Sequence, residues 1–335
     1  MGEVEDSMPK AAVTRILPEA GMDILRKAES AGEIELAVWA GELPPEPDAL
    51  ASLLHGCDGA ITLVTDPIGA ELLDAEPQLK VISNFAVGFD NIDIAAATER
   101  GVTVCNTPGV LTETTADLAW ALLMASARRV VEGADYVRAG KWQTWGPTLL
   151  MGADVHHASI GIIGFGRIGK EVAKRARGFD MRILAFDAYP DQSTARELGV
   201  EFASLDTLLA ESDFVTLHCT LNDETYRLIG AQQLRLMKKT AILVNASRGP
   251  VVDTDALLDA LRAGEIAGAA LDVTDPEPLP SDHPLIGMAN VVIVPHIASG
   301  SVATRNKMAV MAVENLLAGL RGERPAHVVI PEALA

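Results

Sequence analysis

Three residues that could act together on a small acid lie in the second half of the chain. Arg248, Glu277 and His296 each follow a near-continuous apolar run that ends in a polar cluster. A guanidinium can hold a carboxylate through two parallel hydrogen bonds. An imidazole exchanges a proton near neutral pH, and a carboxylate on its far nitrogen fixes the tautomer and favours the charged form. These residue types are suited to a site that holds an organic acid and moves a proton.

A glycine-rich segment gives the second chemical signal. Gly164, Gly166 and Gly169 are spaced G-x-G-x-x-G between an apolar run that begins at Ser159 and a helix expected to begin near Arg167. In a dinucleotide fold the first glycine makes the tight turn, the second lets the backbone approach a pyrophosphate, and the third lets the helix lie close to the strand. The pyrophosphate then binds unpaired N–H groups at the helix N-terminus. The strand, loop and helix in this order predict a dinucleotide site.

The next apolar run, 181–186, is followed by Asp187, 18 residues beyond Gly169. An acidic side chain at this point accepts hydrogen bonds from the adenine ribose hydroxyls, and its charge repels a 2′-phosphate. The sequence therefore predicts NAD as the cofactor, with NADP less favoured. A nicotinamide beside the Arg, Glu and His would be suited to reducing a 2-oxo acid or oxidising a 2-hydroxy acid. The alternative is a tight turn and a strand-end aspartate that bind no ligand.

The chain alternates apolar runs of strand length with helix-length segments, as is typical of parallel sheets covered on both faces. We expect an α/β protein with two doubly wound parallel-sheet domains, in which a Rossmann cofactor domain is inserted into a flavodoxin-like substrate domain. The substrate domain is expected over 1–106 and 300–335, and the cofactor domain over 107–299. The expected strands are 11–14, 35–38, 59–62, 80–83, 181–186, 213–218, 240–245, 267–272 and 291–294, and the expected helices include 19–28, 48–54 and 112–129.

Composition limits the partners. With 335 residues, of which 49% are hydrophobic and 22% charged, the chain is long enough for two separate cores. Its formal net charge of −19 argues against nucleic acid and against an anionic membrane surface, because neither offers countercharge. Residues 1–10 lack the apolar region of a signal peptide and are expected to form a polar extension. No apolar run of about twenty residues could span a bilayer, so we expect a cytoplasmic protein.

Metal and disulfide chemistry are not indicated. Cys57, Cys105 and Cys219 are odd in number, far apart and without a C-x-x-C pair, so they predict neither a disulfide framework nor a zinc site.

Trp142 and Trp145 lie on a segment without clear periodicity. They indicate either an arm that contacts another subunit or a loop anchored on its own domain.

Taken together, these motifs resemble the D-isomer-specific 2-hydroxyacid dehydrogenase family from about Ala11 to Val329. The resemblance rests on the glycine loop and on the segments 87–93 (VGFDNID), 106–109 (NTPG), 115–117 (TAD), 245–249 (NASRG), 272–278 (DVTDPEP) and 295–297 (PHI). It implies that Arg248 binds and orients the substrate, that Glu277 supports the histidine, and that His296 is the general acid and base. The implied substrate is a small 2-oxo acid, glyoxylate or hydroxypyruvate first.

The resemblance also implies the other contacts. Substrate binding is expected from the backbone amides of Val87 and Gly88, and from Arg248 and His296. The expected cofactor contacts are Thr115, Gly164, Gly166, Arg167, Ile168, Gly169, Asp187, Thr220, Thr225, Ala246, Ser247, Arg248, Asp272 and His296. No metal is expected, and relatives are usually homodimers joined through the cofactor domain. The alternatives are a D-3-phosphoglycerate or D-lactate dehydrogenase and, from another class, an NAD-sensing scaffold of the corepressor kind.

Overall fold

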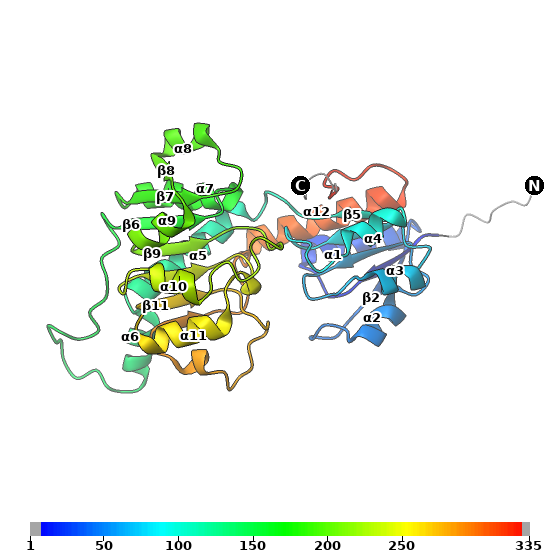
Figure 1. The fold of residues 1–335 in the computed structure, drawn as a ribbon. Coiled ribbons are helices and arrows are strands. Elements are labelled where there is room, and N and C mark those ends of the chain that lie inside the picture. Colours follow the sequence, from blue (N-terminus) through cyan, green and yellow to red (C-terminus); the bar gives the residue numbers. More distant parts are fainter. Residues whose placement is uncertain (1–7, 330–335) are drawn as a thin grey trace, which may run out of the picture. The chain divides into compact units, whose positions relative to one another are not determined.

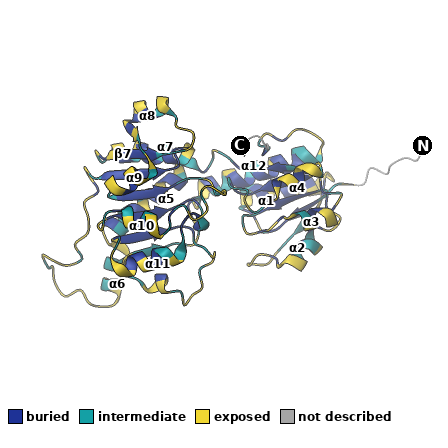
Figure 2. Cartoon of the chain, in the orientation of Figure 1, coloured by how far each residue is buried: buried dark blue, intermediate teal, exposed yellow. Residues whose placement is uncertain are grey.

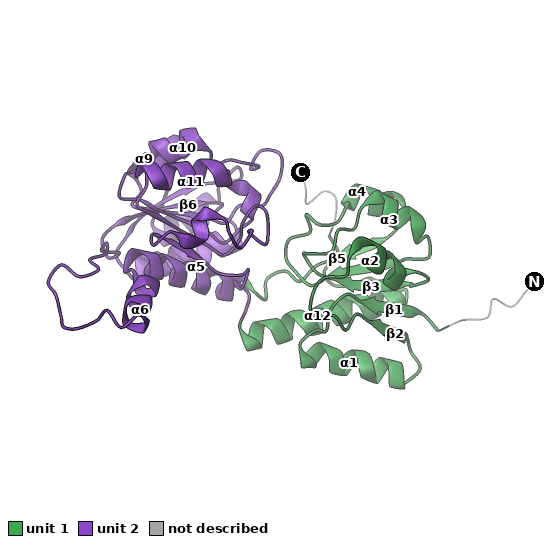
Figure 3. Ribbon diagram, turned by 90° about the horizontal axis from the view of Figure 1, so that it is seen from below, with its two compact units in different colours: residues 1–111, 301–335 green, residues 112–300 purple. Residues whose placement is uncertain are grey.

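The computed structural model describes residues 8–329, which divide into two compact units (Figure 3). Unit 2 is Thr112–Gly300, and unit 1 consists of the chain before and after it. The first boundary lies five residues beyond the one expected after 106, because the segment from Thr107 stays with unit 1 through the hydrogen bond from its N–H to Ala86 O. Of the expected polar extension, residues 1–7 lie outside the described residues, while Lys10 already opens a strand.

Unit 1 contains a five-stranded parallel sheet in the order β2-β1-β3-β4-β5. Its strands are β1 (Lys10–Val13), β2 (Glu35–Val38), β3 (Gly59–Thr62), β4 (Val81–Asn84) and β5 (Thr103–Cys105). Its helices are α1 (Glu19–Ser30), α2 (Pro47–Leu54), α3 (Ala70–Ala75), α4 (Ile94–Glu99) and α12 (Val302–Leu320). Helices α1 and α12 pack against each other, and the other three share a core with the opposite face of the sheet. The order 2-1-3-4-5 is that of flavodoxin-like sheets, as predicted.

Unit 2 contains a seven-stranded parallel sheet in the order β12-β11-β10-β9-β6-β7-β8. Its strands are β6 (Ser159–Ile163), β7 (Arg182–Phe186), β8 (Val200–Phe202), β9 (Phe214–Leu217), β10 (Ile242–Asn245), β11 (Gly268–Leu271) and β12 (Val291–Ile293). Counted from β6, the first six strands follow the Rossmann order 3-2-1-4-5-6, so the predicted fold class is confirmed. Winding reverses between β6 and β9, and ligands bind at the carboxyl ends of strands beside such a reversal.

Helices cover both faces of the unit 2 sheet (Figure 1). They are α5 (Thr112–Ala127), α6 (Val130–Arg138), α7 (Arg167–Arg177), α8 (Gln192–Leu198), α9 (Leu205–Glu211), α10 (Ala231–Leu236) and α11 (Thr254–Ala263). In β6, Ile160 and Ile162 pack with α5 and α7, whereas Ile163 packs with α9 to α11. The strands are therefore buried on both sides (Figure 2), which explains their near-continuous apolar sequences. Within residues 8–329, no helix combines the length and the apolar character needed to cross a membrane.

The segment after α5 differs from the prediction. The helix expected over 112–129 ends at Ala127, because Arg129 adopts a left-handed conformation with φ 50° and separates α5 from α6. After α6 the chain forms no regular structure until β6 and extends away from the sheet of unit 2 (Figure 1). Trp142 and Trp145 on this segment are 62% and 78% exposed, so they do not anchor it on unit 2.

Candidate active site

The polar residues singled out in unit 2 lie at one edge of its sheet. Because β6, β7, β9, β10, β11 and β12 are all parallel neighbours, the loops after their carboxyl ends lie on the same side. The glycine loop follows β6, Asp187 follows β7, Arg248 follows β10, and the segments with Glu277 and His296 follow β11 and β12. One sheet edge therefore carries both the dinucleotide motif and the residues suited to acid chemistry.

His296 and Glu277 are brought into direct contact. Nδ1 of the histidine lies 2.6 Å from Oε1 of the glutamate. Both side chains stay accessible, with 30% and 39% exposed. A carboxylate on Nδ1 orients the ring and leaves Nε2 as the nitrogen that can exchange a proton with a bound molecule. The pair therefore has the arrangement in which a carboxylate orients an imidazole for proton exchange.

Asp272 fixes the backbone beside this pair. Its carboxylate accepts hydrogen bonds from the N–H groups of Ile297 (2.7 Å) and Ala298 (3.0 Å), and its carbonyl accepts one from the N–H of His296 (2.9 Å). Asp272 is 1% exposed, and burial raises the pKa of its carboxyl above the ordinary value. The family resemblance implies a cofactor contact for this residue. What the structure shows is that Asp272 holds the loop that presents the histidine.

Asn245 fixes the backbone of the turn that carries Arg248. The side chain of this strand-end residue donates from Nδ2 to the carbonyl of Arg248 (2.9 Å) and accepts at Oδ1 from N–H (3.0 Å) and Oγ (2.9 Å) of Ser247. At Gly249, an added Cβ would lie 1.8 Å from the carbonyl oxygen of Thr274, so no side chain fits there. The turn is thus fixed at both ends. Asn245 belongs to the predicted NASRG motif with Ala246, Ser247 and Arg248, but its role in holding the turn was not predicted; its signal is a polar residue at the end of an apolar strand.

The glycine loop has the geometry that a dinucleotide requires. Gly164 has φ 92°, and a Cβ there would lie 2.4 Å from the backbone nitrogen of Cys219. At Gly169 a Cβ would lie 2.1 Å from Gly164 O, so the helix approaches the strand as closely as the motif predicts. A Cβ added at Gly166 would meet nothing within 4 Å apart from its chain neighbours, and α7 begins at the next residue, Arg167, followed by Ile168. This open space at a helix N-terminus fits a pyrophosphate.

Asp187 lies beside this loop. Its carboxylate accepts hydrogen bonds from the N–H groups of Phe165 (2.6 Å, to Oδ2) and Tyr189 (2.7 Å, to Oδ1). A carboxylate has about four acceptor sites, so both oxygens can still accept from ribose hydroxyls. The aspartate therefore joins the end of β7 to the glycine loop and can still accept hydrogen bonds from the adenine ribose, as expected.

Three further residues lie away from these clusters. Thr115 is buried in α5, a helix that packs on β10 and β11. Thr220 and Thr225 lie in the turn after β9, where the Thr225 hydroxyl donates to Thr220 O (2.6 Å) and so shapes the turn itself. His218 directly follows β9; burial lowers its pKa to about 3, so it stays neutral at physiological pH.

Comparison with known proteins identifies the family. Residues 120–298 match the family model described as "D-isomer specific 2-hydroxyacid dehydrogenase, NAD binding domain". The chain belongs to the D-isomer-specific 2-hydroxyacid dehydrogenase family. It is therefore an oxidoreductase of this family with a nicotinamide cofactor, and the matched residues lie within unit 2.

Members of this family resemble the whole chain and not only unit 2. The chain is 52% identical to a glyoxylate reductase of Korarchaeum cryptofilum over 327 residues, which are 97% of each chain. It is 46% identical to a glyoxylate reductase of Thermococcus onnurineus over 330 residues, again 97% of each. Among solved structures, a protein of Thermus thermophilus has a TM-score of 0.89 and 48% identity, covering 96% of this chain and all of that one. The resemblance inferred from the sequence motifs is thus confirmed for this dehydrogenase.

Proposed function

We propose that this dehydrogenase uses NADH to reduce a small 2-oxo acid to the D-2-hydroxy acid. The preferred substrates are glyoxylate, whose product is glycolate, and hydroxypyruvate. The observation that carries the proposal is the His296–Glu277 contact at the sheet edge that also holds the dinucleotide loop. The substrate choice is supported by the glyoxylate reductases that are 52% and 46% identical over nearly their whole length.

The proposed reaction assigns a task to each residue. When bound, the reduced nicotinamide supplies a hydride to the carbonyl carbon of the substrate. His296 gives its Nε2 proton to the carbonyl oxygen as negative charge develops there, and Glu277 stabilises the charged imidazole through Nδ1. Arg248 grips the substrate through its guanidinium, which suits a carboxylate. From unit 1, the proposed substrate domain, the backbone N–H groups of Val87 and Gly88 bind the carboxylate.

NADH is proposed over NADPH because the charge of Asp187 would repel a 2′-phosphate. The proposed cofactor contacts are those implied by the motifs: Thr115, Gly164, Gly166, Arg167, Ile168, Gly169, Asp187, Thr220, Thr225, Ala246, Ser247, Arg248, Asp272 and His296. We also propose a homodimer and a cytoplasmic location. The three cysteines are free, as is usual in a reducing compartment.

One assay separates the candidate functions. Oxidation of NADH, followed by its absorbance, would be compared across glyoxylate, hydroxypyruvate, pyruvate and phosphohydroxypyruvate. We expect the first two to give the highest kcat/KM. Fastest turnover of phosphohydroxypyruvate or pyruvate would favour a D-3-phosphoglycerate or D-lactate dehydrogenase instead. Slow turnover of all four would favour an NAD-sensing scaffold.

A further inference from the structure

Three successive backbone carbonyls after β4, in unit 1, each accept a hydrogen bond: those of Ala86, Val87 and Gly88. The donors come from the end of β4 and from the segment after β5. The bonds are Thr107 N–H to Ala86 O (2.7 Å), Asn106 Nδ2 to Val87 O (2.8 Å) and Asn84 Nδ2 to Gly88 O (2.9 Å).

The N–H groups of the same peptide units are left available. In a trans peptide the N–H points opposite to the C=O, so fixing these carbonyls turns the N–H groups of Val87, Gly88 and Phe89 away from the three donors. Within residues 8–329, none of these three N–H groups has a protein acceptor. The three residues are half-buried, so a small molecule can reach them. Consecutive free N–H groups of this kind form a binding site for an anion.

The two asparagines that hold the loop are themselves fixed. Asn84 is fully buried; its Oδ1 accepts from the Thr62 hydroxyl (3.0 Å), and its Nδ2 also donates to Oδ1 of Asn91 (3.1 Å). The carbonyl of Asn106 accepts from Nδ2 of Asn315 (3.1 Å), which lies buried in α12. The Asn84 amide cannot rotate without breaking its bonds to Thr62, Gly88 and Asn91, and the backbone of Asn106 is held by Asn315, so the direction of the three N–H groups is set before any ligand arrives.

We propose that Asn84 and Asn106 are positioning residues for the substrate carboxylate, and that Phe89 adds a third backbone donor to those of Val87 and Gly88. This inference rests on the proposed function, in which the loop binds the carboxylate of a 2-oxo acid. Hydrogen bonds to a charged acceptor are about twice as strong as neutral ones and depend on geometry. Loss of one anchoring amide therefore weakens binding of the anion while the N–H groups remain present.

The test is Asn106→Ala, which removes the donor to Val87 O without adding charge. Substrates would be glyoxylate and its uncharged methyl ester. We expect kcat/KM for glyoxylate to fall about 10- to 100-fold, mainly through KM, as expected for losing much of one charge-assisted contact. The ester should change less than about threefold, because it carries no carboxylate. KM for NADH should not change. The matched control is Asn290→Ala, which likewise removes an Nδ2 bond to a backbone carbonyl, Ala267 O at 3.0 Å, but in unit 2.

A binding measurement makes the outcome independent of turnover. Oxamate, a carboxylate that cannot be reduced, would be titrated calorimetrically into the NADH-bound protein. We expect its Kd to rise about tenfold or more in Asn106→Ala, again one charge-assisted contact, and to stay unchanged in Asn290→Ala. An equal loss with glyoxylate and ester, no loss with either, or no oxamate binding by the wild type overturns the inference. A wild type that binds oxamate through Asn106 but reduces no 2-oxo acid would overturn only the proposed function.

Discussion

His296 is the one member of the Arg248, Glu277 and His296 set whose backbone lies in the left-handed region, with φ 50°. For a residue with a Cβ this conformation costs about 1–2 kcal/mol, so neighbouring contacts must stabilise it. The buried carboxylate of Asp272 supplies them by accepting from the next two N–H groups. The imidazole thereby keeps its contact with Glu277 without depending on a flexible loop.

Replacing the histidine tests the proton transfer directly. His296→Ala should lower kcat for glyoxylate reduction by roughly 10²- to 10⁴-fold, the usual contribution of positioned proton transfer. NADH affinity, measured by fluorescence titration, should change little, because His296 is one of many proposed cofactor contacts and the dinucleotide loop is untouched. Wild-type turnover in this variant with every 2-oxo acid would show that another group donates the proton.

Asp187 governs the prediction on the cofactor. The wild type should have a much higher kcat/KM with NADH than with NADPH, because the carboxylate repels a 2′-phosphate. Asp187→Asn keeps the shape and removes the charge, so the preference should shrink about tenfold or more, corresponding to about 1.4 kcal/mol. Both values come from the same initial-rate assay. A wild type that prefers NADPH would contradict the role given to Asp187.

Among the elements, β4 in unit 1 and β10 in unit 2 fix the loop that follows them in the same way. Each ends in an asparagine whose side chain bonds to the backbone of the following loop, Asn84 in unit 1 and Asn245 in unit 2. Apolar runs predicted these strands because parallel strands are buried on both faces. The loops after them were expected to hold chemistry because ligands bind at that edge. Which side chains hold the loops could not be predicted, since it depends on contacts between residues such as Asp272 and Ala298, 26 positions apart.

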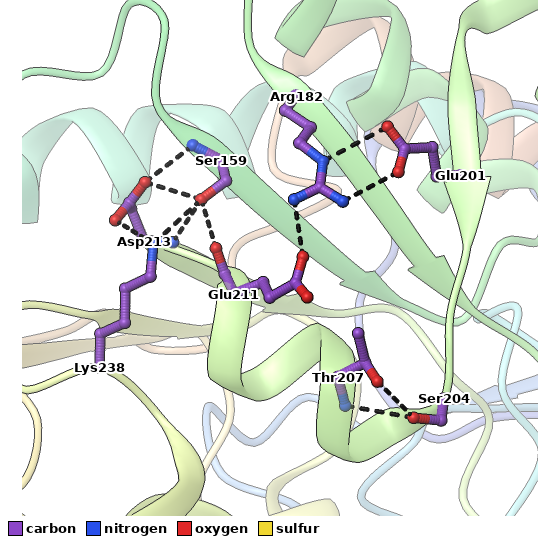
Figure 4. Close-up of polar contacts among 8 residues, drawn as sticks. All are labelled: Ser159, Arg182, Glu201, Ser204, Thr207, Glu211, Asp213 and Lys238. Atoms are coloured by element: carbon purple, nitrogen blue, oxygen red, sulfur yellow. Dashed lines mark hydrogen bonds and ion pairs between the residues drawn. The ribbon is translucent and has the colours of Figure 1, made fainter.

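The opposite edge of the unit 2 sheet carries a polar network that should serve stability (Figure 4). The Asp213 carboxylate, ahead of β9, accepts from Ser159 N–H (2.9 Å) and Oγ (2.7 Å) at the start of β6 and from Lys238 Nζ (2.8 Å) before β10. Burial alone would raise the pKa of Asp213, but these hydrogen bonds outweigh it and lower the pKa. The carboxylate therefore joins three segments in its charged form.

Asp213→Asn should lower the free energy of unfolding at neutral pH by about 1 kcal/mol, or a few degrees in Tm, without changing kcat. Because the folded pKa is lowered, the stabilisation is present above the unfolded value near about 4 and is lost as pH falls through the folded value. Thermal unfolding at several pH values should show the two proteins converging in acid. Arg182→Gln is the control: its partners Glu201 and Glu211 are exposed, so its effect should be below about 0.5 kcal/mol. A gap that persists in acid would contradict the proposal.

For the whole molecule, the net charge determines what a site for an anionic substrate requires. A net charge of −19 opposes the approach of an anionic substrate, so local donors must outweigh the overall field. Each unit carries donors of this kind: backbone N–H groups follow β4 in unit 1, and a guanidinium follows β10 in unit 2. The cofactor loop could be predicted from the glycine spacing together with the apolar strand before it and the helix after it. The family resemblance also implied the N–H groups of Val87 and Gly88, but the N–H of Phe89 could not be predicted, because its availability depends on which carbonyls the surrounding chain holds.

The last prediction concerns assembly. Helix α6 and the segment after it expose several large apolar side chains: Val130, Val131, Val137, Trp142, Trp145, Leu149 and Met151. Such a concentration of exposed apolar area, rich in tryptophan, is typical of a protein interface. In the proposed homodimer, a second copy of this chain would cover this apolar surface.

Replacing Trp142 and Trp145 together by serine should therefore convert a particle of twice 35.4 kDa into the monomer in sedimentation or light scattering at micromolar concentration. Leu43→Ser removes a side chain that is 77% exposed in unit 1 and should leave the mass unchanged. A monomeric wild type, or a dimer that survives the double replacement, would mean that this surface serves another purpose. Because aromatic residues near the centre of an interface contribute most of its binding energy, two replacements should suffice to separate the subunits.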